Sequence, residues 1–284
     1  MIQLLGNMRF LAVFVFSMSV LSCVGMGHDG RGGDGETPDC GHGKLNVVIL
    51  GDSNTSIGGD DCDNPKGWNK WFKDKFAPAS CKSYARSGAT WTNTTATKYD
   101  IEENTGRISD DNVIYNQVNR LVKAVGSGSQ AKPDLILVAA GTNDAWFAAK
   151  RPKVFDKSAA EAFSVTGGYI TSRKASGVVT LAESLRYGCE MLMSHFPDAQ
   201  IILLTPLQST AARADYIRKV GDVIEECARY MGLGVIRMDY LGSVYSVRER
   251  VKPARTYDGT HTSEDGARRN GRLVANMVSS MLQY

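Results

Sequence analysis

The sequence lacks several motifs by which enzymes are often recognised. It contains no C-x-x-C pair and no His/Cys cluster with metal-ligand spacing, so we expect no structural zinc and no other bound metal. It has no G-x-S-x-G elbow, no H-E-x-x-H and no phosphate loop ending in Gly-Lys-Ser/Thr, which argues against three familiar kinds of catalytic or nucleotide site. We therefore expect no cofactor.

A concentration of charge of one sign is also missing. The chain has 33 Lys and Arg against 30 Asp and Glu, a formal net charge of +3, and no run of five or six like charges. Proteins that bind nucleic acid concentrate basic side chains, so we expect no nucleic-acid partner. The 284 residues are 43% hydrophobic, which is sufficient for one large domain with a substantial core.

An apolar run long enough to span a bilayer comfortably is absent. The N-terminal apolar stretch covers residues 10–20 and follows Arg9, which is typical of a signal peptide over residues 1–22. The tetrapeptide Val-Leu-Ser-Cys ending at Cys23 resembles a bacterial lipoprotein signal, so we expect lipid on Cys23, with ordinary cleavage as the alternative. Residues 23–43, rich in Gly and Asp, favour a flexible tether. We expect an exported protein that meets a membrane only through this anchor.

Five cysteines remain beyond the expected lipidation site: Cys40, Cys62, Cys81, Cys189 and Cys227. Export would place them in an oxidising compartment. Cys62 and Cys81 lie in loop-like stretches on either side of one expected helix and could pair. Cys189 and Cys227 lie on apolar faces of helical patterns, which favours buried thiols. The sequence leaves the pairing open.

Beyond residue 44, apolar runs alternate with helical patterns. Apolar runs predict buried strands of a parallel sheet at residues 45–50, 134–140, 201–205 and 235–238, and residues 80–85 are expected to form a further strand between the first two helices. Apolar positions at helical spacing predict helices at residues 65–76, 112–125, 180–196, 215–231 and 263–282. The alternation predicts one α/β domain over residues 44–284, with three α/β/α layers around a doubly wound parallel sheet of about five strands.

Two segments interrupt this alternation. Residues 91–111 and 145–177 each follow a predicted strand and are longer than such a connection needs. They should reach the ligand-binding edge of the sheet, so they are candidate lids or substrate walls.

The first predicted strand, residues 45–50, ends abruptly in Gly51-Asp52-Ser53-Asn54. In open α/β sheets the carboxyl ends of the strands form the ligand-binding edge, so the Ser53 hydroxyl is placed for chemistry. The alternative is that Asp52 and Ser53 only cap the helix that follows.

Histidine is scarce, with four in the chain. His28 and His42 lie in the expected tether, and His195 ends a predicted helix, where a cation favours the helix dipole without any catalytic role. His261 is left as the candidate base. Asp258, three residues earlier, can hold one ring nitrogen so that the other accepts a proton from a serine hydroxyl. The alternative is a loop histidine bonded to the acid for structural reasons.

Four short blocks occur in an order typical of one family. They are Gly51-Asp52-Ser53, Gly88 within residues 85–89, Gly-Thr-Asn-Asp at residues 141–144, and Asp258-x-x-His261. From about residue 44 to the C-terminus, the blocks resemble those of the SGNH hydrolases, also called GDSL esterases. Asn54 replaces the leucine of the GDSL name, at a position that varies in the family. The resemblance implies a flavodoxin-like fold.

The resemblance also implies ester hydrolysis by a Ser-His-Asp triad. Ser53 would attack the carbonyl, His261 would take the hydroxyl proton and return it to the leaving alcohol, and Asp258 would orient the imidazole. The Ser53 N–H, the Gly88 N–H and the Asn143 side-chain amide would form the oxyanion hole, each donor contributing about 3 kcal/mol.

The substrate is less well defined by the sequence. Asp52 and Asn54 flank the serine, and Trp91 and Trp146 follow the second and third blocks, so these four are candidate substrate-wall residues. An exported esterase without an apolar lid helix is expected to remove short acyl groups, mainly acetyl, from extracellular glycans. The alternatives are a lipase, lysophospholipase or thioesterase, acyl transfer by the same triad, or a glycan-binding lipoprotein that keeps the fold without turnover.

Overall fold

The computed structural model describes residues 42–94, 96–99, 111–164 and 168–282. The predicted signal peptide, the lipidation of Cys23 and nearly all of the predicted tether lie outside these residues. The described elements belong to one compact unit, Asp39–Tyr284. No helix within the described ranges is both long and apolar enough to cross a membrane.

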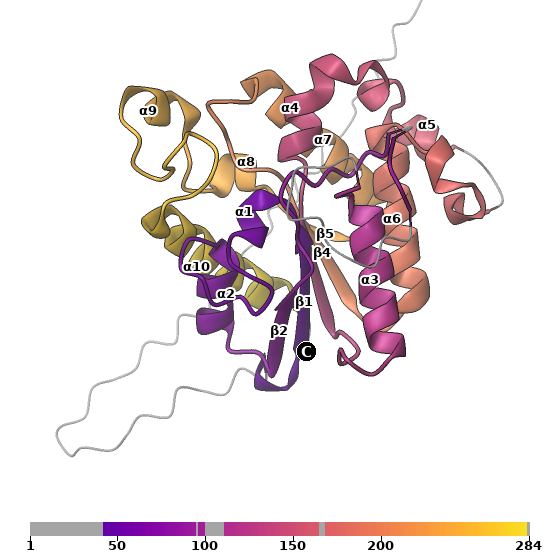
Figure 1. The fold of residues 1–284 in the computed structure, drawn as a ribbon, viewed down its shortest axis with the longest axis horizontal. Coiled ribbons are helices and arrows are strands. Elements are labelled where there is room, and N and C mark those ends of the chain that lie inside the picture. The colour runs from indigo at the N-terminus through magenta and orange to yellow at the C-terminus, as the bar shows by residue number, and fades with distance from the viewer. Residues whose placement is uncertain (1–41, 95, 100–110, 165–167, 283–284) are drawn as a thin grey trace, which may run out of the picture. The chain divides into compact units, whose positions relative to one another are not determined.

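Five parallel strands form one sheet. They are β1 (Asn46–Gly51), β2 (Ser80–Ser83), β3 (Leu135–Ala139), β4 (Gln200–Leu204) and β5 (Gly234–Ile236). Their order is β2-β1-β3-β4-β5 (Figure 1). This is the flavodoxin-like order, in which the chain changes direction between β1 and β3 and leaves a ligand-binding crevice there. The predicted doubly wound parallel sheet is confirmed.

Helices cover both faces of the sheet. The longer ones are α2 (Trp68–Phe76), α3 (Ile114–Gly126), α6 (Leu181–His195), α7 (Ala214–Met231) and α10 (Glu264–Met281). In Figure 1, α2 and α10 lie on one side of the strands, and α3 and α6 lie on the other. Each matches a helix expected from its apolar spacing, with ends that differ by a few residues.

Successive residues of β1 enter opposite cores. Val47 and Ile49 share a core cluster with α2 and α10, whereas Val48 and Leu50 share one with α3, α6 and α7. All four side chains are fully buried, and each burial contributes about 2 kcal/mol. Since both faces need apolar residues, the strand is a continuous apolar run in the sequence.

Short helices fill the longer connections. They include α1 (Ser53–Ser56), α4 (Thr142–Phe147), α5 (Ala159–Phe163), α8 (Met238–Leu241) and α9 (Ser246–Val251). Residues 145–177, a candidate lid, contain α5 and several single-turn 3-10 helices. Buried Val154 and Ile170 attach the described part of this segment to the core that contains α6, so it is packed onto the domain.

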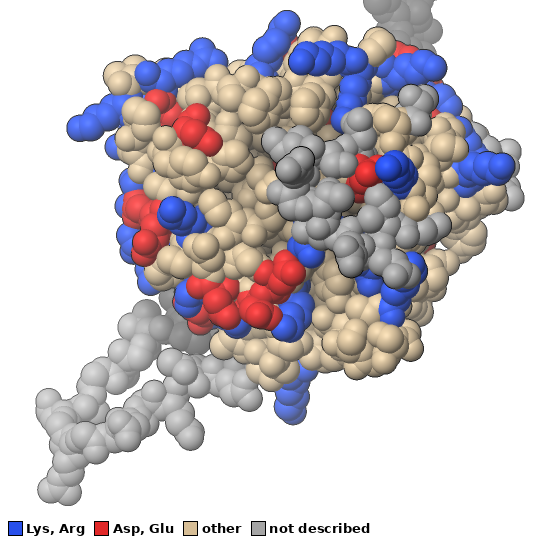
Figure 2. All heavy atoms as spheres, viewed as in Figure 1, with Lys and Arg blue, Asp and Glu red and all other residues tan. Residues whose placement is uncertain are grey.

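Surface charge is mixed. On the face shown in Figure 2, Lys and Arg lie around the edge, with Asp and Glu among them. Exposed pairs such as Lys132–Asp198, at 2.7 Å, contribute little to stability. The expected lack of a nucleic-acid partner stays a prediction.

Candidate active site

Ser53 lies at the carboxyl edge of the sheet, where β1 gives way to α1. Asp52 caps α1 by accepting a hydrogen bond from Asn54 N at 3.1 Å, and Ser53 is the first residue of the helix. Gln117 of α3 holds the preceding residue, because its Oε1 accepts from Gly51 N and its Nε2 donates to Gly51 O, both at 2.8 Å. The backbone before Ser53 is therefore fixed on both sides.

His261 connects Ser53 to Asp258. Its Nε2 lies 2.9 Å from Ser53 Oγ, and its Nδ1 lies 2.6 Å from Asp258 Oδ2. With the ring proton on Nδ1, Nε2 is the acceptor for the serine hydroxyl. Asp258 Oδ1 also accepts from the backbone N–H groups of Thr260 at 2.9 Å and His261 at 2.7 Å. The three side chains have the geometry of a Ser-His-Asp triad.

These hydrogen bonds determine the charge of Asp258. Partial burial raises the pKa of its carboxyl, but the bonds from the His261 ring and from two backbone N–H groups outweigh burial and hold the pKa below its ordinary value. Asp258 is thus ionised at neutral pH and can stabilise an imidazolium at His261.

Glu249 of α9 anchors the start of the loop that carries Asp258 and His261. Its carboxylate is only 2% exposed and accepts from the backbone N–H groups of residues 254–256. It also accepts from Thr256 Oγ1 at 2.7 Å. Burial raises the pKa of Glu249, yet these bonds keep it below the ordinary value. The buried, ionised carboxylate of Glu249 therefore fixes the start of the loop that carries Asp258 and His261.

Gly259 permits the tight turn between Asp258 and His261. Its φ is +85°, a region that favours glycine, and a Cβ there would lie 1.8 Å from Thr210 Oγ1. Thr210 N donates to Gly259 O at 2.8 Å. The turn is thus closed against a neighbouring segment and has no room for a side chain.

The two other segments predicted for the oxyanion hole meet at the same edge. Asn143 Nδ2 of α4 donates to Ala89 O at 2.9 Å, next to Gly88, which has a φ of +76°. This bond uses one of the two amide N–H donors. Ser87 Oγ lies 3.1 Å from Ser56 Oγ of α1. The Gly88 loop is therefore held between α1 and α4.

Asp52 and Asn54, predicted as substrate-wall residues, are only 3% and 6% exposed. Burial raises the pKa of Asp52 to about 6, although Thr142 and Asn54 donate hydrogen bonds to it. Asn54 Oδ1 accepts from Thr262 N at 3.2 Å, which ties α1 to the loop of His261. The wall prediction is wrong for both residues, because their side chains face inward and support the site.

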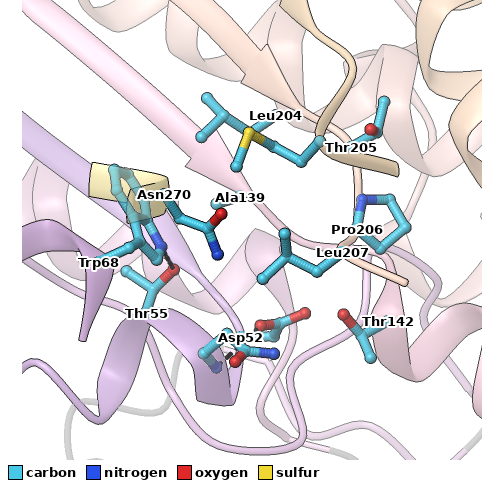
Figure 3. A pocket seen from close by; sticks show the side chains of 12 residues that line it. Asp52, Thr55, Trp68, Ala139, Thr142, Leu204, Thr205, Pro206, Leu207 and Asn270 are labelled. Carbon is cyan, nitrogen blue, oxygen red and sulfur yellow. Dashed lines mark hydrogen bonds between the residues drawn. The ribbon is translucent and has the colours of Figure 1, made fainter. Parts of the chain in front are cut away.

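Asp52 and Asn54 both line a small cavity, and Figure 3 shows Asp52 at its wall. Asn270 of α10 contributes its amide to the lining, and Leu207 and Thr142 line other sides. Asn270 is fully buried, and its Nδ2 has no hydrogen-bond partner among the described residues. The volume of about 30 Å³ suits one or two water molecules, so this cavity is too small for an acyl chain.

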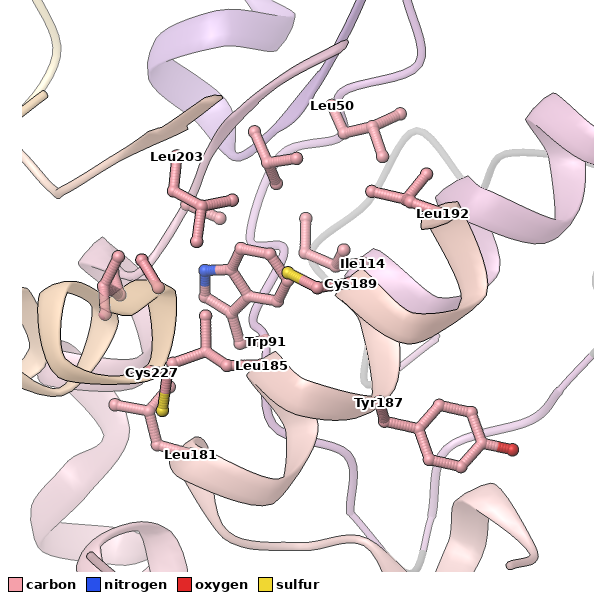
Figure 4. Close-up of a cluster of buried hydrophobic side chains, with 14 of the residues drawn as sticks. Leu50, Trp91, Ile114, Leu181, Leu185, Tyr187, Cys189, Leu192, Leu203 and Cys227 are labelled. Atoms are coloured by element: carbon pink, nitrogen blue, oxygen red, sulfur yellow. The ribbon is translucent and has the colours of Figure 1, made fainter. Parts of the chain in front are cut away.

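The two tryptophans proposed as substrate walls lie in different surroundings. Trp91 is 2% exposed and lies inside the core beside Leu185 (Figure 4), so its wall prediction is wrong. Its backbone N–H donates to Asp144 Oδ2 at 2.9 Å and thereby helps to position α4. Trp146 is 47% exposed and stacks on Phe147, with ring centroids 6.4 Å apart.

Four residues of the site were not predicted. Gln117 binds the backbone of Gly51, and Glu249 binds the start of the loop that carries His261. The carboxylate of buried Asp144 also accepts hydrogen bonds from the backbone N–H and the hydroxyl of Thr92. Tyr257, 56% exposed, stacks on His261 with ring centroids 5.7 Å apart and an interplanar angle of 16°. Asp144 and Tyr257 lie within or next to quoted blocks, whereas nothing local in the sequence distinguishes Gln117 or Glu249.

Within the described ranges, no group of three or more His, Cys, Asp and Glu could hold a metal ion. The side chains of the site offer a hydroxyl, an imidazole, a carboxylate and an amide. A serine, a histidine and an aspartate hydrogen-bonded in series at the carboxyl edge of a doubly wound sheet are typical of a serine hydrolase.

The chain belongs to the GDSL-like lipase/acylhydrolase family, whose model matches residues 49–269. This range includes all four sequence blocks, and the family resemblance inferred from them is confirmed. Membership makes the protein an ester hydrolase. No curated protein matches the chain.

Several solved structures share the fold. A protein described as a GDSL-like lipase from Bacteroides uniformis has a TM-score of 0.52 and 20% identity, covering 86% of this chain and 100% of its own. One so described from Bacteroides ovatus has a TM-score of 0.51 and 16% identity, covering 84% and 99%. A Chitinophaga pinensis protein described as a lipase has a TM-score of 0.52 and 17% identity, covering 84% and 97%. At these identities the likeness concerns the fold alone.

Proposed function

We propose that the protein is a serine esterase that removes short acyl groups, mainly acetyl, from extracellular carbohydrate. The observation that carries this proposal is the continuous series of contacts from Ser53 Oγ through His261 to Asp258, at 2.9 and 2.6 Å. A serine hydroxyl is a weak nucleophile unless a base takes its proton. A module that only binds glycans has no need of such an arrangement.

In the proposed mechanism, Ser53 Oγ attacks the ester carbonyl while its proton passes to His261 Nε2. The imidazolium that forms is stabilised by ionised Asp258, and it returns the proton to the leaving alcohol. Water then attacks the acyl-enzyme with His261 again acting as base, which releases the carboxylic acid and restores Ser53.

The developing oxyanion requires donors that are already in place. The N–H groups of Ser53 and Gly88 and the second N–H of the Asn143 amide are our candidates. Each would contribute about 3 kcal/mol to the stabilisation of the transition state. The bond from Asn143 to Ala89 O supports this assignment, because it restrains the amide and the Gly88 loop together.

The surroundings of the triad favour a bulky polar group on the alcohol side of the ester. Tyr257, on His261, and Trp146, three residues beyond Asn143, are both about half exposed. Exposed aromatic faces of this kind suit sugar rings. The Asp258 and His261 side chains are themselves 41% and 24% exposed, so a polymer can approach the base without opening a buried channel. The export and lipid anchor expected from residues 1–23 would bring the enzyme to extracellular glycans.

The test is ester hydrolysis by the wild type and by Ser53→Ala, with Ser280→Ala, at an exposed position of α10, as a matched control. The substrates are the p-nitrophenyl esters of acetate, butyrate and octanoate, followed by chemically acetylated xylan. We expect the wild type and Ser280→Ala to prefer acetate and to release acetate from the polymer. Ser53→Ala should lose at least about 10⁴-fold in kcat/KM while remaining folded.

Other outcomes would redirect the proposal. A preference for octanoate over acetate would indicate a lipid substrate for the same triad. Full activity in folded Ser53→Ala would exclude the triad. No wild-type turnover on any ester would favour the glycan-binding alternative.

A further inference from the structure

Two cysteines lie next to each other, one in the segment that follows the nucleophile and one in the strand that leads toward Gly88. Cys62 lies in the loop between α1 and α2, and Cys81 lies in β2, paired in register with Val47. Their Sγ atoms are 3.7 Å apart without a bond between them, and the side chains are 0% and 5% exposed. A disulfide would require the two sulfurs to approach to about 2.0 Å.

The other two described thiols provide a contrast. Cys189 and Cys227 both lie in the core around α6 (Figure 4), and Cys227 Sγ is 3.9 Å from the carbonyl oxygen of Ala182. Burial raises the pKa of both thiols, to about 12 for Cys227. They have the surroundings of inert, buried thiols.

The surroundings of Cys62 differ in charge and backbone conformation. The Cys81 thiol donates a hydrogen bond to Cys62 Sγ, and this bond lowers the pKa of Cys62. Asn69 Nδ2 donates to the same sulfur at 3.3 Å. The φ of Cys62 is +56°, a conformation that non-glycine residues seldom adopt unless their surroundings hold them. Thus the backbone presents Cys62 to Cys81, and its polar contacts favour the thiolate.

We propose that Cys62 and Cys81 form a disulfide in an oxidising compartment, and that this bond locks the loop after α1 onto β2. The oxidant is a disulfide, either oxidised glutathione or the disulfide of a dithiol oxidase. The Cys62 thiolate attacks it, forms a mixed disulfide and releases one thiol. Once Cys62 is in the mixed disulfide, the Cys81 thiol loses its proton and attacks Cys62 Sγ, which releases the second thiol. Two electrons and two protons pass from the protein to the oxidant.

The existing contacts show what the bond would reinforce. Asp60, in the same loop as Cys62, accepts a hydrogen bond from Ser83 N at 2.8 Å through its backbone oxygen. Its carboxylate pairs with Arg86 Nη1 at 2.7 Å, two residues before Gly88. These bonds already attach the loop to β2 and to the approach to Gly88. Any effect of the disulfide on catalysis rests on the proposed function, whereas the bond itself does not.

The first experiment maps the bond in the purified full-length chain. The protein is incubated with oxidised glutathione or with dithiothreitol, alkylated under denaturing conditions and digested without reduction. After oxidation we expect a linked pair of peptides containing Cys62 and Cys81, about 2 Da lighter than the two reduced peptides together. Cys189 and Cys227 should be recovered alkylated. Recovery of both Cys62 and Cys81 as alkylated peptides after oxidation would overturn the proposal.

The second experiment measures the melting temperature with and without dithiothreitol. Reduction should lower the wild-type Tm by about 5 to 10 °C, because the bond closes a loop of moderate length. Cys62→Ser and Cys81→Ser should not respond to reduction, whereas Cys227→Ser, as the control, should keep the full shift. An unchanged wild-type Tm on reduction would contradict the locking role. If a Ser variant fails to fold, the difference in Tm between oxidised and reduced wild type still shows whether the disulfide stabilises the protein. Neither readout depends on esterase activity, so the proposed function is tested separately.

Discussion

The two halves of the candidate site are held in different ways. Ser53 follows a fully buried strand, and its approach is fixed by Gln117 and Asp52, both almost entirely inaccessible. Asp258 and His261 lie on a partly exposed loop whose position depends on Glu249, Gly259 and a bond from Thr262 to Asn54. The nucleophile is therefore positioned by the fold, whereas the acid and the base are positioned by a few hydrogen bonds.

The acids of the two halves also differ in charge state. Burial raises the pKa of Asp52 to about 6, whereas hydrogen bonds lower the pKa of Asp258. Ionisation of Asp52 thus destabilises the folded protein, whereas ionisation of Asp258 stabilises it. Changes near Ser53 should mainly affect stability, and changes in the loop should mainly affect turnover.

The largest effect is expected from Asp258→Asn. Loss of the carboxylate removes the group that orients the His261 ring and stabilises its cation, so kcat/KM should fall by about 10³ to 10⁴-fold. The melting temperature should fall only slightly, because the Asp258 side chain is 41% exposed and its ionic interactions are screened by solvent. Steady-state kinetics measures the effect, and Asp198→Asn, an exposed acid on another loop, is the control. A loss below tenfold would mean that Asp258 is not needed to orient the ring.

Gln117→Leu should have the largest effect on stability. It leaves the buried N–H of Gly51 without a partner and removes one of the two donors to Gly51 O, which still accepts from Arg86 N at 3.1 Å. The loss should cost about 2 kcal/mol of unfolding free energy. Urea unfolding measures it, with Gln200→Leu, which removes one partly buried bond to Met281, as the milder control. Equal losses in the two variants would show that the nucleophile is not specially supported from α3.

Asp52→Asn should stabilise the protein at neutral pH. Between the ordinary pKa of 3.8 and about 6, the folded wild type binds more protons than the unfolded chain, so its stability falls as the pH rises. Asparagine cannot ionise, so the variant should lose the contribution of Asp52 to this slope and be more stable by about 2 kcal/mol at pH 7. Buried Asp144, whose pKa is also raised by burial, keeps its own contribution in both proteins.

The same pH series separates the two halves of the site. The lowered pKa of Asp258 contributes stability above 3.8, and this contribution is lost as the pH falls below that value. Asp258→Asn should therefore keep the wild-type slope between pH 4 and 6. Urea unfolding at successive pH values measures both variants, and a wild-type slope in Asp52→Asn would contradict the raised pKa.

The smallest effect is expected from Glu249→Gln. The amide oxygen can still accept hydrogen bonds from the loop, but the charge and one acceptor oxygen are lost. We expect kcat/KM to fall by about tenfold and stability by about 1 kcal/mol. Kinetics and urea unfolding measure both effects, with exposed Glu226→Gln as the control. A stability loss without any loss of turnover would show that the histidine loop keeps its position by other means.

Much of the fold could be predicted because the buried strands and the longer helices each have a recognisable pattern of apolar residues in the sequence. The continuous apolar run of β1 results from burial on two faces, and the longer helices have one apolar side. The short helices α1, α4, α8 and α9 were not predicted, since four to six residues are too few for a helical period to be recognised. Their positions depend on tertiary contacts.

The order of the four blocks indicated which side chains would meet, and the structure brings Ser53, Asp258 and His261 together. Polar supports were harder to foresee. Gln117 binds Gly51, 66 residues earlier in the chain, and Glu249 binds the loop that precedes Asp258. Nothing near either residue in the sequence indicates these partners. Trp91 was misjudged because adjacency to a block says nothing about the direction in which a side chain points.

The most direct test of the central claim is covalent labelling with a fluorophosphonate, which reacts with a serine only when a neighbouring base activates it. We expect one adduct per chain on the peptide that contains Ser53. The label should be absent from Ser53→Ala and at least about 100-fold slower in His261→Ala. Labelling of another residue, or ester turnover by wild type that survives without any adduct at Ser53, would contradict the account.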